Sequence, residues 1–168
     1  MKLIAKFSLV LMFCAQGAFS ASLKEDVTMD YSVKVEKFFN EFNKDKLDLV
    51  YDFYSSDTHF EDPIGSHEGV ESVKAYYANL YKNVQDIRFD FTNHICAKNQ
   101  CVSAWTMHLT TEKLNGGKPI SVDGNSIFKF NDTGKAIYHR DYFDMGAFIY
   151  EQVPILKNII SYIKNQLK

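Results

Sequence analysis

The spacing of apolar residues changes near residue 85 from a helical period to a strand period, and this change orders the elements of the fold. Before it, apolar side chains recur three and four residues apart, which is typical of amphipathic helices. Three such stretches are 31–43, 47–54 and 70–81. After it, Ile87, Phe89 and Phe91 alternate with polar residues, which predicts a strand. Helices followed by a run of strands indicate an α+β domain whose helices lie against one face of a sheet.

Four strands are expected in the second half of the chain. The first follows residue 85 and continues to Cys96, and the others cover 102–111, 119–130 and 135–144. Two of the connecting turns carry glycine, at 115–117 and 131–134, as β-hairpins commonly do. Consecutive hairpins predict an antiparallel, strongly curved meander. A short extended piece over 59–62 is expected between the second and third helices.

The first twenty residues have the pattern of a cleaved secretory signal. Lys2 and Lys6 precede an apolar run that is too short to span a bilayer, and small Ala18 and Ser20 precede a cut before Ala21. We therefore expect an exported protein, periplasmic or secreted from a bacterium; a retained membrane tether is the alternative. The expected parts are the signal (1–20), an N-terminal tail (21–30), one domain (31–145) and a C-terminal helical extension (146–168).

Charge and composition narrow the class of partner. The chain carries 19 basic and 21 acidic side chains, and loss of residues 1–20 would remove two lysines and leave a formal charge of −4. A mildly acidic domain without a basic stripe argues against nucleic acid as a partner. The aromatic content of 15% suits a core that also lines a cavity for a small apolar molecule.

Cys96 and Cys101 are separated by four residues, across a tight hairpin. In an exported protein such a pair favours a disulfide, with metal binding as the weaker alternative, because no second Cys/His pair stands at zinc-site spacing. No motif for a cofactor and no regular spacing of metal ligands is found, so we expect neither.

The tail beyond Gly146 is expected to be helical, with Pro154 in the first turn of a fresh helix. Its apolar side chains form one stripe, which consists of Leu156, Ile159, Ile160, Ile163 and Leu167. Its lysines lie largely on the opposite face: Lys157, Lys164 and Lys168. Such a stripe favours packing on its own domain or on a partner subunit. Contact with a membrane surface is the alternative.

The order of elements and three short stretches resemble a known superfamily. The stretches are Glu61-Asp62-Pro63-Ile64-Gly65-Ser66, Tyr76-Tyr77-Ala78-Asn79 and Phe130-Asn131-Asp132-Thr133-Gly134-Lys135. Over roughly 31–144 the chain resembles nuclear transport factor 2-like proteins, and within them SnoaL-like and ketosteroid isomerase-like proteins. The resemblance implies an α/β cone, or cystatin-like roll, with three helices packed on the curved sheet around a pocket. This fold hosts isomerases, cyclases, hydrolases, dehydratases and binding modules without catalysis.

Asp62 matches the general base in the Asp-Pro-x-Gly loop of ketosteroid isomerases, although a simple role in the turn is the alternative. Phe38 and Ser126 stand where those isomerases keep a tyrosine and a protonated aspartic acid, the pair that stabilises the enolate. Steroid isomerase activity of the familiar kind is therefore not expected.

The last strand supplies other polar groups. Alternation puts Ile137, His139, Asp141 and Phe143 on one face, and the resemblance implies that this face lines the pocket. The candidate catalytic residues are thus Asp62, His139 and Asp141. The candidate pocket residues are Phe38, Tyr77, Ser126 and Phe143. A hydrogen-bonded core histidine is the alternative for His139.

Two functions are close to level on this basis. One is acid/base catalysis, of isomerase, cyclase or hydrolase type, on a small apolar carbonyl-bearing or cyclic compound. The other is an accessory protein of the envelope that binds a small molecule without turnover or forms a homodimer through the open face of its sheet. A peripheral protein held on a membrane by its tail helix is a distant third.

Overall fold

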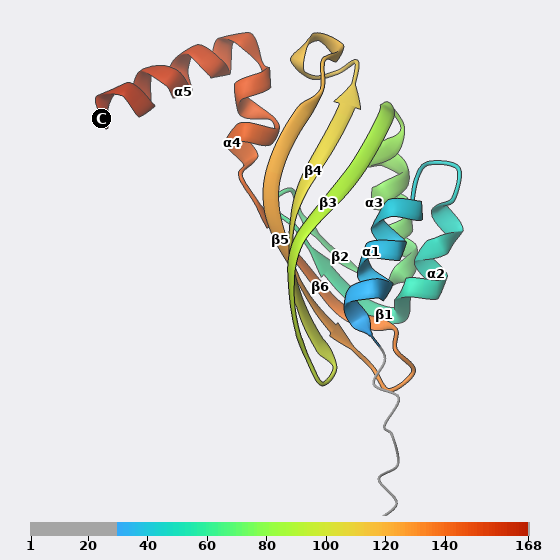
Figure 1. Cartoon of the computed structure of the whole chain (residues 1–168). Helices are drawn as coiled ribbons and strands as arrows, with labels where there is room; N and C mark the ends of the chain where they lie inside the picture. Colours follow the sequence, from blue (N-terminus) through green and yellow to red (C-terminus); the bar gives the residue numbers. More distant parts are fainter. Residues whose placement is uncertain (1–29, 168) are drawn as a thin grey trace, which may run out of the picture.

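The computed structural model describes residues 30–167, in which helices lie on one face of a six-stranded sheet and a last helix leaves the domain (Figure 1). The elements in chain order are α1 (Tyr31–Glu41), η1 (Leu47–Leu49), α2 (Val50–Phe53), β1 (Tyr54–Glu61), β2 (Ser66–Glu68), α3 (Val70–Tyr81), β3 (Val84–Ala97), β4 (Gln100–Thr111), η2 (Asn115–Gly117), β5 (Ile120–Phe130), β6 (Ala136–Phe143), α4 (Met145–Phe148), η3 (Tyr150–Gln152) and α5 (Pro154–Gln166). The expected signal, 1–20, and most of the tail, 21–30, lie outside the described residues.

The sheet has the order β2-β1-β6-β5-β4-β3. The four strands from β3 to β6 form the expected antiparallel meander. The sheet as a whole is mixed, because β1 runs parallel to β6. A parallel pair needs a long crossover, and most of the domain lies between these two strands in sequence. The sheet is open, with β2 and β3 at its edges.

The second expected helix, 47–54, is only partly helical. The chain forms the 3₁₀ turn η1 and one α-helical turn, and Tyr54 already begins β1. β1 is consequently longer than the extended piece expected over 59–62. The apolar spacing of Leu47, Val50 and Tyr54 fits two turns followed by a strand equally well, since all three contribute to the core.

The helices bury an aromatic layer against the sheet. On α1, Val35, Phe38 and Phe39 are buried, and the helix begins where the Asp30 carboxylate accepts hydrogen bonds from the backbone of Ser32 and Val33. On α3 the buried face consists of Val70, Val73, Tyr77 and Tyr81. The inner rings of α1 and α3 thus form one wall of the space above β1, β6, β5 and β4.

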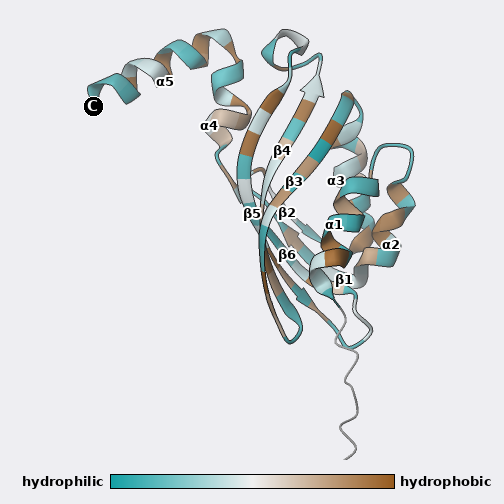
Figure 2. Ribbon diagram, in the orientation of Figure 1, coloured by the Kyte–Doolittle hydropathy of each residue, from teal (hydrophilic) through white to brown (hydrophobic). Residues whose placement is uncertain are grey.

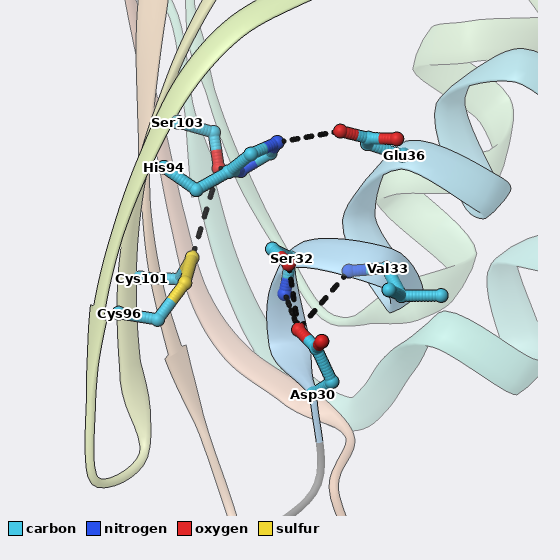
Figure 3. The surroundings of a disulfide bond; sticks show 8 residues. All are labelled: Asp30, Ser32, Val33, Glu36, His94, Cys96, Cys101 and Ser103. Atoms are coloured by element: carbon cyan, nitrogen blue, oxygen red, sulfur yellow. Dashed lines mark hydrogen bonds and ion pairs between the residues drawn. A yellow bond between two sulfur atoms is a disulfide. The ribbon is translucent and has the colours of Figure 1, made fainter.

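The expected disulfide is present at the far end of the β3–β4 hairpin, where Cys96 and Cys101 lie opposite each other (Figure 3). Beside it, His94 links the hairpin to α1. Its Nδ1 lies 2.8 Å from Ser103 Oγ and its Nε2 lies 2.9 Å from Glu36 Oε1. This end of the hairpin is therefore tied both covalently and through polar contacts.

A bulge in β6 changes one expected side-chain direction. Lys129 pairs with Tyr138 and the next residue, Phe130, pairs with Ala136, so Ile137 has no partner of its own. Ile137 is 36% exposed, whereas Ala136 is fully buried. The prediction that Ile137 faces the interior is therefore wrong. From His139 onward, the predicted alternation of inward and outward side chains is correct.

α5 does not pack on its domain. It projects from the rest of the molecule, and apolar and polar residues succeed each other along its exposed ribbon (Figures 1 and 2). Ile155, Ile159 and Leu167 are 74%, 52% and 82% exposed. Of the two kinds of packing expected for this stripe, packing on its own domain is wrong, and packing on a partner subunit stays a prediction. None of the helices described here has the length and apolar content to cross a membrane.

Candidate functional site

The site is built on β5 and β6, whose inward side chains lie directly opposite each other. Ser126 pairs with Asp141, and Phe128 pairs with His139. Phe60 of β1 lies on the other side of His139 in the parallel pairing. Three neighbouring strands therefore bring aromatic and polar groups onto one inner surface.

His139 is fully buried, and both of its ring nitrogens have hydrogen-bond partners. Nε2 lies 2.8 Å from Asp141 Oδ1, and Nδ1 lies 2.8 Å from the Tyr54 hydroxyl. An ionised carboxylate only accepts, so Nε2 is the donor to Asp141, and in the corresponding neutral tautomer Nδ1 accepts from the Tyr54 hydroxyl. The ring also stacks on Phe128, with 4.3 Å between centroids. His139 thus has no open nitrogen, and it holds Asp141.

One oxygen of Asp141 is held by two donors, and the other is open. Oδ1 accepts from His139 and, at 2.5 Å, from Ser126 Oγ. Ser126 Oγ in turn accepts from Trp105 Nε1 at 2.8 Å, which directs its hydroxyl hydrogen toward the carboxylate. No hydrogen bond from residues 30–167 reaches Oδ2. Asp141 therefore presents one fixed carboxylate oxygen to a ligand.

The Asp62 carboxylate is fully engaged in its turn. Oδ1 accepts from the backbone N–H groups of Ile64 and Gly65, at 2.7 and 2.9 Å, and Oδ2 accepts from the Tyr76 hydroxyl. Its own N–H donates to the Gly65 carbonyl. Asp62 closes the turn that the Asp-Pro-x-Gly sequence predicts, and it is buried, at 7% exposure. The geometry therefore favours the turn role over that of a general base.

Asp62 and Asp141 line one cavity of about 50 Å³. Nine of its fifteen lining residues are aromatic: Phe39, Phe60, Tyr76, Tyr77, Tyr81, Phe89, Trp105, Phe143 and Phe148. The two aspartates are its only charged lining residues among those described. A dry cavity of about 150 Å³ accepts benzene, so this one admits a very small molecule unless aromatic side chains move.

The tyrosines around the cavity remain protonated at neutral pH. Burial raises the pKa of Tyr54 and of Tyr77 well above the ordinary value. For Tyr76, burial and then the hydrogen bond to Asp62 raise the pKa. For Tyr81 the causes are burial and the negative charge of Asp141. These hydroxyls therefore act as neutral donors.

The structure gathers only some of the expected pocket residues. Tyr77 and Phe143 line the cavity with the two aspartates. Phe38 does not; it stacks on Phe53 with 4.1 Å between centroids and borders a separate surface hollow beside Lys34. Ser126 lies behind Asp141 and touches the cavity only through that residue. The prediction that Phe38 and Ser126 line the pocket is therefore wrong.

Three residues of the site are not among the candidate site residues that the sequence predicted. Tyr54 was assigned to a helix, so its contact with His139 was not foreseen. Tyr76 lies within a stretch that carried the resemblance, but its position in the sequence does not indicate that its hydroxyl donates a hydrogen bond to Asp62. Trp105 shares its face of β4 with Ser103 and Met107, and this alternation was the available signal.

Of the other histidines, His67 lies behind the cavity wall, where its ring packs on Tyr76 with 4.3 Å between centroids, and His108 and His59 lie away from the cavity. His108 and His59 belong to the outer face of the sheet, where His108 lies between Asp90 and Ser121 and His59 contacts Glu68. Arg140 also faces outward and pairs with Glu61. No group of three His, Cys, Asp or Glu side chains within residues 30–167 is arranged to hold a metal ion.

The comparisons with known proteins agree with the fold described above. A family model described as a SnoaL-like domain matches residues 35–139. No curated protein matches the chain. A proposed SnoaL-like polyketide cyclase from a Jannaschia species has 17% identity and a TM-score of 0.63, over 72% of this chain and 90% of its own.

Two further solved structures have the same fold. A hypothetical protein from Catenulispora acidiphila with a ketosteroid isomerase-like fold, in complex with trimethylamine, has 13% identity and a TM-score of 0.62, covering 74% of this chain and 92% of its own. A proposed isomerase of the SnoaL-like family from Agrobacterium tumefaciens has 17% identity and a TM-score of 0.54, covering 70% and 97%. At these identities the likeness establishes the fold.

Proposed function

The chain belongs to the SnoaL-like domain family, and on that premise we propose that it is an isomerase- or cyclase-type enzyme that performs acid/base chemistry on a small carbonyl-bearing or cyclic compound. The observation that carries the proposal is Asp141. Among the three candidate catalytic residues, it alone lines the cavity with an oxygen that no described residue engages.

In this proposal Asp141 Oδ2 takes the proton from the substrate. His139 and Ser126 fix the carboxylate through Oδ1 and are positioning residues, and Trp105 fixes Ser126. Because the donors are already oriented when the substrate arrives, no reorganisation is needed during proton transfer. Asp62 shapes the cavity wall through its turn.

The charge of the cavity limits the substrate and the reaction. With two carboxylates and no lining cation, an anionic ligand would be repelled, so we infer a neutral or cationic compound. The trimethylamine bound by the protein with a similar fold supports including small amines. Tyr76 already donates to Asp62, so a full oxyanion beside it would meet a negative charge. An enolate oxygen formed when Asp141 removes a proton must therefore lie away from Tyr76 and Asp62.

Deuterium exchange tests Asp141 without knowledge of the natural substrate. The α-protons of acetone, which suits the small cavity, and of cyclopentanone would be followed by ¹H NMR in D₂O with the purified protein. We expect exchange above the buffer rate, and a fall of about 10²-fold or more in Asp141→Asn, as is usual when a positioned base is removed. Asp123→Asn, an exposed carboxylate on the outer face, is the matched control and should keep the parent rate.

Two outcomes would count against catalysis by Asp141: equal exchange in Asp141→Asn and the parent, or no exchange with any ketone tested. The second would favour a binding protein without turnover. A specific observation supports that candidate, since Asp62 and His139 are already satisfied by other groups. Native mass spectrometry of protein purified from its own envelope would then reveal a retained small molecule.

We also propose that the protein is exported. The support is the signal-like pattern of residues 1–20 together with the Cys96–Cys101 disulfide, since disulfides persist in oxidising compartments. The intact mass of the protein from its natural host should correspond to a chain that begins at Ala21 with both cysteines oxidised. A mass that includes residues 1–20 would contradict cleavage.

A further inference from the structure

α5 presents an apolar surface that no described element covers. At 100° per residue its apolar side chains occupy an arc of roughly 160°. Four of them within Pro154–Gln166 are more than half exposed: Ile155, Ile159, Tyr162 and Ile163. A 13-residue helix is marginal in water when little packs against it, so α5 lacks the burial that normally stabilises such a helix.

The charges of α5 differ in sign from those of the rest of the protein. Residues 154–168 contain three lysines and no acidic residue. Residues 30–153 carry 19 acidic and 13 basic side chains, a formal charge of −6. Lys157 and Lys164 both fall at one border of the apolar arc, where long side chains can reach outward while their stems stay on apolar surface.

We propose that α5 binds the surface of an anionic lipid bilayer. The apolar arc enters the boundary between headgroups and acyl chains, and Lys157 and Lys164 meet lipid phosphates. Lys164 exchanges its exposed ion pair with Glu151 of η3 for this contact. Because α5 projects from the sheet at α4 and η3, its arc can reach a membrane without displacing any part of the domain (Figure 1). Anionic lipid matches a polar face whose only charged side chains are lysines, which a zwitterionic surface would not.

A second copy of the chain fits these charges less well. Two α5 helices packed through their apolar arcs would bring lysines together, and α5 has no acidic residue to pair with them. Helix pairs normally place opposite charges at the borders of the seam. The lipid surface is therefore the occupant that satisfies both the apolar arc and its charge.

Vesicle co-sedimentation tests the proposal with the full mature protein. The vesicles are phosphatidylcholine alone or phosphatidylcholine with phosphatidylglycerol, at low and high salt. We expect binding to the anionic vesicles at low salt, little to phosphatidylcholine, and release at high salt. Lys157→Gln with Lys164→Gln should weaken binding about thirtyfold, at about fivefold for each lysine near an anionic surface. Ile159→Glu with Ile163→Glu should abolish it.

The matched control is Lys44→Gln with Lys46→Gln, which removes the same charge from exposed positions between α1 and η1, on the other side of the domain from α5 (Figure 1). It should bind within about twofold of the parent, because distant charges are screened. An equal loss in this control, or equal binding to both vesicles, would overturn the proposal.

Measurements without lipid test the two alternatives, in which α5 packs on its own domain or on a second copy of the chain. If Ile159→Glu with Ile163→Glu lowered the melting temperature of the monomer, α5 would pack on its own domain in solution. A candidate seat is the apolar hollow of about 230 Å³ beside Leu109, Leu114 and Ile149. If the same variant dissociated a dimer in sedimentation velocity, the partner would be a second copy. Either result would overturn the lipid assignment.

Discussion

Gly124 has no side chain because the Trp105 indole fills the space that a Cβ would need. A Cβ at this position would lie 2.3 Å from Trp105 Cη2. The two residues are direct partners in the β4–β5 ladder. The missing side chain lets the indole lie against the strand, from which Nε1 reaches Ser126. The position of the Asp141 carboxylate thus depends on a glycine two strand positions away from Ser126.

Gly124→Ala should displace the indole and destabilise the protein by about 1–3 kcal/mol, the usual cost of overpacking a core. Trp105 is the only tryptophan of the chain, so its fluorescence reports the displacement directly, and urea unfolding measures the free energy. Asn125→Ala, the outward neighbour on β5, is the control. An unchanged emission spectrum in Gly124→Ala would mean that the indole does not occupy this site.

The buried tyrosines predict loss of stability at alkaline pH. In the unfolded chain a tyrosine ionises near pH 10. Burial raises the pKa of Tyr54 and Tyr77 in the folded chain, so these hydroxyls keep their protons there. Their contribution is complete below the unfolded pKa and is lost as pH rises from about 10 toward the folded pKa.

Urea midpoints measured from about pH 8 to about pH 11 should therefore fall at the upper end. Tyr77→Phe should make the fall shallower, because one of the buried ionisable hydroxyls is gone. Tyr162→Phe, which changes an exposed tyrosine of α5, should leave the slope as it was. Equal slopes for the parent and Tyr77→Phe would contradict the assignment to this residue.

At the scale of elements, β3 and β4 are the two longest strands, and they form one hairpin. The disulfide links the two strands at the turn end of this hairpin. Cys96 is exposed, whereas Cys101 is fully buried. His94, between Ser103 and Glu36, is the polar contact that links this end to α1 (Figure 3). The disulfide therefore joins an exposed strand end of β3 to a buried position of β4.

Replacing both cysteines by alanine should lower the free energy of unfolding by about 2 kcal/mol, the chain-entropy value for so short a loop. Urea unfolding of the oxidised parent, the reduced parent and the variant gives the comparison. Reduced parent and variant should agree with each other. If the oxidised and reduced parents unfolded at the same urea concentration, the bond would contribute nothing to stability.

At the scale of the whole molecule, α5 buries no residue against the domain, and its charge is opposite in sign to that of the domain. α4 belongs to the domain, because Phe148 is 5% exposed and lines the cavity. α5 contributes no buried residue. The boundary between the stable body and the extension therefore falls after η3, rather than after residue 145 as the sequence suggests.

Deleting residues 154–168 should change the melting temperature by no more than about 2 °C, since little buried surface is lost. Deleting residues 145–168 also removes Phe148 and should lower it by about 10 °C. Differential scanning calorimetry of both truncated forms distinguishes the two segments. A large loss in the shorter deletion would show that α5 stabilises the body.

Much of the local structure could be predicted from the sequence. Amphipathic spacing located α1 and α3, strict alternation located β3 to β6, and the close pair of cysteines predicted the disulfide. These features depend on neighbours within a few residues, so a single sequence contains them. The resemblance carried by Asp62 and the stretches around Tyr76 and Phe130 extended this to the family.

Tertiary structure decided which of these elements meet and which atoms remain open. The parallel pairing of β1 with β6 put Tyr54 on His139, and the bulge at Ile137 set which residues of β6 face inward. Phe38 and Asp141 both lie on inward faces, yet only Asp141 reaches the cavity. Strand register, bulges and the free stripe of α5 arise from pairing between distant segments, and local periodicity holds no information about that pairing.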